Sequence, residues 1–74
     1  MYPVLNSITA NMQDEAKAIE GYTNLLWIAQ DELEPKDFMA LYETVSEIIS
    51  DELNHVTRLQ ALYSMLSDIE AGAE

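Results

Sequence analysis

The chain has 74 residues and no cysteine, so it forms one small domain that neither a disulfide nor a thiolate-bound zinc stabilises. Three Lys and Arg residues stand against 14 Asp and Glu residues, which gives a formal net charge of −11. A surface of this sign repels phosphate groups, so nucleic acid and anionic membrane surfaces are excluded as partners. No apolar run approaches the roughly 20 residues that cross a bilayer.

The N-terminal sequence gives an expectation about location. Residues 1–3 (MYP) lack the basic and then apolar pattern of a secretory signal. We therefore expect a cytoplasmic protein.

The first predicted helix covers about residues 6–33, a stretch that contains no proline. Ser7 is a plausible N-cap for it. Pro3 at a first-turn position would also allow an earlier start.

The turn is predicted at residues 34–37, where Pro35 disfavours helical geometry in the residue before it and suits the first turn of a new helix. The second predicted helix then covers about residues 37–70, and Gly72 favours its end. Two long helices around a tight turn predict an all-α fold, a single antiparallel helical hairpin over residues 1–74.

Both helices carry an apolar seam whose members recur at alternating spacings of three and four residues. In the first helix the members are Leu5, Ile8, Met12, Glu15, Ile19, Tyr22, Leu26, Ala29 and Leu33. In the second they are Phe38, Leu41, Val45, Ile48, Glu52, His55, Leu59, Leu62, Leu66 and Ile69. The charged or ionisable members, Glu15, Glu52 and His55, interrupt each seam at one level only.

These three residues are predicted to meet. Residues equidistant from the turn of an antiparallel hairpin lie side by side. Glu15 lies 20 positions before Pro35, and Glu52 and His55 lie 17 and 20 positions after it. The spacing therefore predicts one polar cluster on the inner face.

One such cluster offers too few donors for a closed di-metal site and is too polar to bury unpaired. A symmetric homodimer would bring four carboxylates and two imidazoles into the centre of a four-helix bundle. This ligand set matches the di-iron and di-manganese carboxylate sites of helix bundles, which combine single glutamates with Glu-x-x-His pairs.

The sequence resembles the ferritin-like di-iron carboxylate family at residues 15–22 (EAKAIEGY) and 51–55 (DELNH). Because the chain carries one helix pair rather than two, it is most similar to the half-length encapsulated ferritins. The resemblance implies Glu15 as terminal ligand, Glu52 as bridging ligand and His55 as nitrogen ligand. Tyr22 and Asp51 match positions that surround the ligands, and Asp51 is expected to accept a hydrogen bond from a ligating imidazole.

The resemblance implies a ferroxidase, which oxidises Fe(II) at a di-iron site between two subunits for iron storage or detoxification. Glu15, Glu52 and His55 are then the metal ligands and the catalytic residues, with about one iron per chain. Carboxylates suit hard Fe(II), Fe(III) and Mn(II), and an imidazole adds selectivity over calcium and magnesium. Manganese with peroxide, or zinc, is an alternative use of the same site.

A metal-free helical dimerisation module is the alternative from another class, since Glu-x-x-His is a weak motif by itself. The position of all three residues on the seam favours a metal, because charged groups are rare in a core without partners. Leucine at these positions would make a metal-free dimerisation module more stable.

Three further features of the sequence concern packing and assembly. Tyr42, Ile49, Val56 and Tyr63 form a second stripe, which widens the bundle face or joins dimers into a larger ring. Gly21 is expected to permit close helix packing rather than chemistry. The acidic segment 67–74 does not resemble the Gly/Leu-rich tail with which encapsulated ferritins dock in an encapsulin-type shell, so such a shell as partner is not supported.

Overall fold

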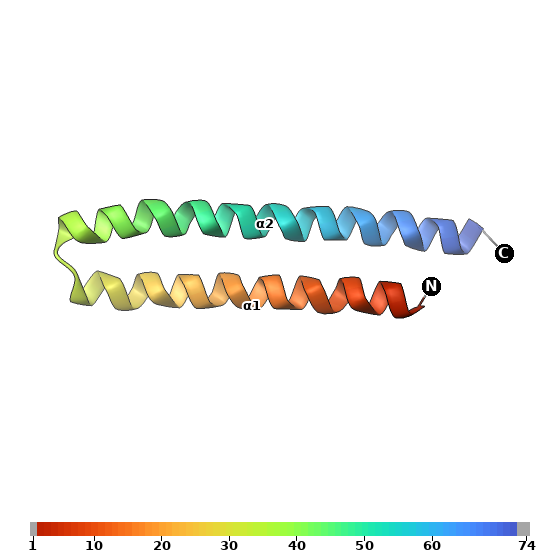
Figure 1. The fold of residues 1–74 in the computed structure, drawn as a ribbon, viewed down its shortest axis with the longest axis horizontal. Coiled ribbons are helices and arrows are strands. Elements are labelled where there is room, and N and C mark those ends of the chain that lie inside the picture. Colours follow the sequence, from red (N-terminus) through yellow and green to blue (C-terminus); the bar gives the residue numbers. More distant parts are fainter. Residues whose placement is uncertain (1, 73–74) are drawn as a thin grey trace.

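The computed structural model describes residues 2–72, and Met1, Ala73 and Glu74 lie outside the described residues, including the end of the acidic segment 67–74. It shows two helices, α1 (Tyr2–Glu32) and α2 (Pro35–Gly72), and no strand in residues 2–72. The helices run antiparallel and side by side over the length of α1, and the C-terminal end of α2 extends beyond the start of α1 (Figure 1). The all-helical prediction is confirmed.

Helix α1 begins at Tyr2, four residues before the predicted start at residue 6, and ends at Glu32. Ser7 therefore lies inside the helix instead of capping it. The reason is Pro3, which falls in the first turn, where backbone N–H groups have no helical partner and the missing N–H of proline costs nothing.

The connection between the helices is shorter than predicted, because only Leu33 and Glu34 lie outside them. The carbonyl oxygen of Glu34 accepts a 2.9 Å hydrogen bond from the amide of Phe38, which makes Glu34 the N-cap residue of α2. Pro35 then occupies the first helical position, and Asp37 places a negative charge at the positive end of the helix dipole. Helix α2 continues to Gly72, two residues beyond the predicted end.

The hairpin buries little apolar surface by itself. The buried hydrophobic residues of its described part are Leu5, Ile8, Ala29 and Val45. Thirteen large hydrophobic side chains of the described chain are exposed, and Trp27, Met39, Ile69 and Leu53 are more than half exposed. A single hairpin therefore leaves much of its apolar surface in contact with water.

The dimensions of the hairpin are those of a rod, 60 × 15 × 10 Å. Its radius of gyration is 17.2 Å, whereas a compact domain of this length has about 11 Å. Its accessible surface is 5646 Å², about 1,000 Å² more than a folded monomer of this mass exposes. The excess is close to the roughly 800 Å² that each partner buries in a standard protein interface.

The four residues of the second stripe of α2 differ in their exposure to solvent. Ile49 and Val56 are half-buried against α1, whereas Tyr42 and Tyr63 at either end are exposed. The inner half of the stripe therefore widens the face that packs within the hairpin. No helix in residues 2–72 is long and apolar enough to cross a membrane.

Candidate metal centre

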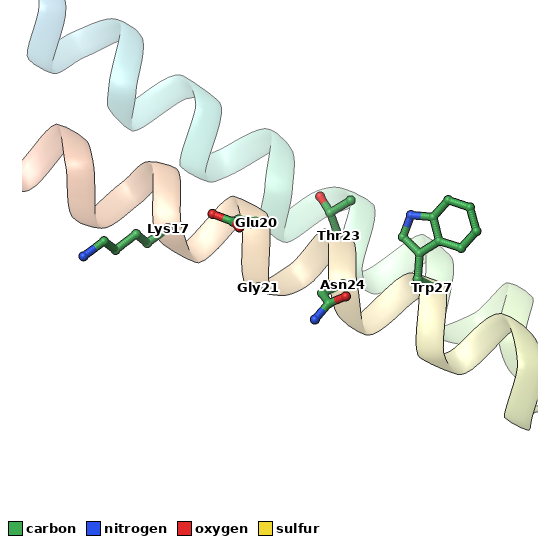
Figure 2. Close-up of a pocket in the computed structure, with 6 residues that line it drawn as sticks. All are labelled: Lys17, Glu20, Gly21, Thr23, Asn24 and Trp27. Atoms are coloured by element: carbon green, nitrogen blue, oxygen red, sulfur yellow. The ribbon is translucent and has the colours of Figure 1, made fainter.

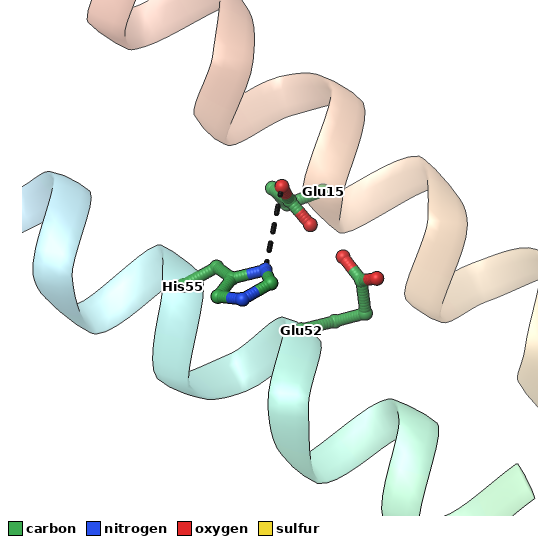
Figure 3. A group of neighbouring side chains, drawn as sticks. All are labelled: Glu15, Glu52 and His55. Carbon is green, nitrogen blue, oxygen red and sulfur yellow. Dashed lines mark ion pairs between the residues drawn. The ribbon is translucent and has the colours of Figure 1, made fainter.

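Glu15 from α1 and Glu52 and His55 from α2 point toward one another midway along the hairpin (Figure 3). One ligand atom from each residue lies within 4.8 Å of the other two. Glu52 and His55 are three residues apart, which places both side chains on the same face of α2. The antiparallel register brings Glu15 opposite that face.

An ion pair in the cluster joins the imidazole to the carboxylate of the other helix. Nδ1 of His55 lies 3.7 Å from Oε1 of Glu15. This distance is too long for a hydrogen bond and leaves room between the two donor atoms. The orientation assigns Nδ1, rather than Nε2, as the atom of His55 that faces the centre of the cluster.

The spacing of the donor atoms fits a metal ion. Ligand atoms bound to one ion at about 2.1 Å lie at most about 4.2 Å from each other. The spread of 4.8 Å therefore exceeds the bound geometry by less than an ångström, which small side-chain rotations remove. Two carboxylates with one imidazole are also a donor set that iron, manganese and zinc accept.

The cluster is open on one side. The Glu15 side chain is 27% exposed and the His55 side chain is 51% exposed, while Glu52 is half-buried. Three protein residues leave coordination positions of a six-coordinate ion unfilled. The centre that one hairpin offers is thus a partial site with room for donors from outside the chain.

The structure brings together Glu15, Glu52 and His55, the three polar residues that the sequence predicts to meet. Their role as metal ligands stays a prediction. Tyr22 is half-buried one heptad beyond Glu15 in α1. Asp51 is exposed, and residues 2–72 show no hydrogen bond between Asp51 and His55. The expected support of the imidazole by Asp51 is therefore not made within the hairpin.

Sequence reasoning missed Asn11 and Arg58 as neighbours of this centre. Together with the seam residue Leu59, they line the same hollow as Glu15 and His55. Helical spacing was the available signal, because Asn11 precedes Glu15 by four residues and Arg58 follows His55 by three. Arg58 attracts attention as one of only three basic residues in an acidic chain.

A larger hollow lies elsewhere, on the outer side of α1 (Figure 2). Its lining residues all belong to that one helix: Lys17, Glu20, Gly21, Thr23, Asn24 and Trp27. A hollow of this kind is a gap between exposed side chains beside a glycine. We prefer the cluster of Glu15, Glu52 and His55 as the functional centre, since its donors converge from both helices.

The expectation that Gly21 permits close helix packing is not met within the hairpin, because a Cβ atom built there meets nothing within 4 Å. Glycine inside a helix costs about 0.5–1 kcal/mol relative to alanine. Substituting Gly21→Ala should therefore raise the free energy of unfolding by about that amount, measured by urea titration. A loss of stability instead would show that another chain approaches the backbone at Gly21.

No protein family, no curated protein and no solved structure matches the chain. The resemblance to ferritin-like proteins stays a prediction from the sequence motifs around Glu15, Glu52 and His55.

Proposed function

We propose that two copies of the chain form a four-helix bundle whose centre holds two iron ions, and that the protein is a ferroxidase. One observation carries the proposal, namely the convergence of Glu15, Glu52 and His55 within 4.8 Å from two helices. Two such partial sites joined by two-fold symmetry supply four carboxylates and two imidazoles. That is the donor set of di-iron carboxylate centres in helix bundles.

The apolar surface of the hairpin supports the pairing. Leu62 and Ile69 follow His55 at intervals of seven residues on α2, and both are exposed, as is Leu25 on α1. Covering these side chains with a second hairpin would remove them from water at about 25 cal/mol per Å² of apolar surface. It would also bring the open sides of the two clusters together.

Iron is the substrate in this proposal. Glu15 and His55 of each chain bind one ferrous ion, and the two Glu52 carboxylates bridge the pair and hold the ions close together. The two ferrous ions would each give one electron, and these two electrons with two protons would reduce oxygen to hydrogen peroxide, or hydrogen peroxide to two water molecules. The acidic surface of the chain favours the approach of the cation, since the formal net charge is −11.

Detoxification of ferrous iron suits this architecture better than storage. Two paired hairpins enclose no space for a mineral, so storage needs a larger assembly or a container. A cytoplasmic location, where ferrous iron meets oxygen, is part of the proposal. Manganese with peroxide is a use of the same ligands that the donor set also favours.

The metal-free dimerisation module is favoured by a different observation, the exposed apolar surface, which calls for a partner with or without metal. A measurement of metal binding distinguishes the ferroxidase from the metal-free dimerisation module. Anaerobic titration with ferrous iron should saturate near one ion per chain, and the protein should have the mass of at least a dimer in analytical ultracentrifugation. A stoichiometry near zero in a dimeric protein would establish the dimerisation module instead.

A further inference from the structure

Arg58 lies beside the candidate metal centre without a partner for its charge. It lines the hollow that Glu15 and His55 also line, one helical turn beyond His55. The only ion pair that the structure shows in residues 2–72 is between His55 and Glu15, so Arg58 forms none there. A guanidinium group in a strongly acidic chain is thus left available at the edge of the site.

The neighbours of Arg58 in this hollow do not accept hydrogen bonds from its guanidinium group. Asn11 donates its side-chain amide to the carbonyl oxygen of Ser7 at 2.8 Å, back along its own helix. Leu59 is apolar, and the Glu15 carboxylate faces the His55 imidazole. The hollow therefore combines two metal-directed side chains with one free cation on its wall.

The charge balance of the site, which rests on the proposed function, determines what this cation attracts. Glu15 and Glu52 contribute two negative charges in each chain, and one divalent metal ion neutralises them. Arg58 then leaves the loaded site positive, and oxidation of the metal adds a further positive charge. An empty site is negative, so it repels anions.

We propose that Arg58 binds a small oxyanion of the phosphate type at the edge of the metal-loaded centre. A guanidinium group presents paired N–H donors that match two oxygens of such an anion. The anion's remaining oxygens lie on the side of the metal, whose open positions accept hard oxygen donors. Arg58 is thereby a specificity-determining residue that couples anion binding to metal loading.

The other basic residues of the chain lack this environment. Lys17 lines the outer hollow of α1 together with Glu20. Lys36 lies in the first turn of α2 beside Asp37. Lys17 is therefore a matched control, because its substitution removes the same charge from the outer side of α1, and residues two apart in a helix do not face each other.

The test uses zinc, a redox-inactive ion that the donor set accepts, so that binding is measured apart from oxidation. Inorganic phosphate is titrated into the zinc-loaded dimer and followed by ³¹P NMR and calorimetry. Phosphate should bind only the zinc-loaded protein. Arg58→Gln should weaken phosphate binding at least about tenfold, as expected for a lost hydrogen bond to a charged group, and should leave zinc stoichiometry unchanged. Arg58→Lys should bind with intermediate affinity, and Lys17→Gln as tightly as the native protein.

Several outcomes would overturn the inference while leaving the proposed function intact. Zinc bound near one ion per chain with equal phosphate affinity in native and Arg58→Gln protein would remove Arg58 from the site. Equal competition by chloride at matched ionic strength would show general charge screening instead of an oxyanion site. Failure of zinc and iron to bind at all would overturn the proposed function, and this inference with it.

Discussion

Substituting Glu52→Ala should abolish fast oxidation of ferrous iron, because a carboxylate that bridges two ions holds both of them. Glu15→Ala and His55→Ala should have the same effect, since each removes one of three ligands that converge within 4.8 Å. Loss of a group that merely supports a metal ligand already costs 10–100-fold in affinity or activity. Loss of a ligand itself should therefore lower the initial rate at least about 100-fold, measured by the absorbance of the ferric product.

Glu43→Ala and Glu47→Ala are the controls for this experiment. Both glutamates lie on α2 within nine residues of Glu52, and both are exposed and outside the cluster. Each control removes one negative charge from α2, as Glu52→Ala does, so the general attraction of cations changes equally in these three variants. Equal losses in the control and cluster variants would show that the acidic surface, and no defined site, carries the oxidation.

The double substitution Glu52→Leu with His55→Leu should raise the melting temperature of the metal-free dimer and eliminate metal binding. In the proposed bundle the open sides of two clusters face each other, which gathers four carboxylates and two imidazoles at one level. Like charges repel there, and each group loses water without a full set of hydrogen bonds. Replacing buried charged groups by apolar ones of similar size stabilises proteins by roughly 1–4 kcal/mol, so we expect a rise of several degrees.

Thermal melts in chelator and in anaerobic ferrous iron measure this effect. Iron should raise the melting temperature of the native protein alone, because a ligand that binds only the folded state shifts unfolding by mass action. The matched control is Glu43→Leu with Glu47→Leu, which adds the same leucines to the exposed side of α2. A native protein indifferent to iron, together with a cluster variant that unfolds, would show that Glu52 and His55 serve the fold.

The sequence by itself determined the helical hairpin and the level at which its three polar seam residues meet. Alternating spacings of three and four residues specify one face of a helix, and a single Pro35 divides the chain into two helices of similar length. Equal separations from the turn then place Glu15 opposite His55, because both helices rise by the same amount per residue. Periodicity and distance from the turn are sufficient for both conclusions.

Only the tertiary structure decided how exposed the cluster of Glu15, Glu52 and His55 is and which residues surround it. Three features of the site depend on side-chain rotamers and on how closely the helices approach. They are the 51% exposure of His55, the orientation of its Nδ1 toward Glu15, and the free guanidinium group of Arg58 in the same hollow. Helical spacing fixes the direction of a Cα–Cβ bond but not the torsions beyond it. The N-terminal bound of α1 also needed the structure, since Pro3 and Ser7 both suit a helix start and the earlier one prevails when residues such as Leu5 pack against α2.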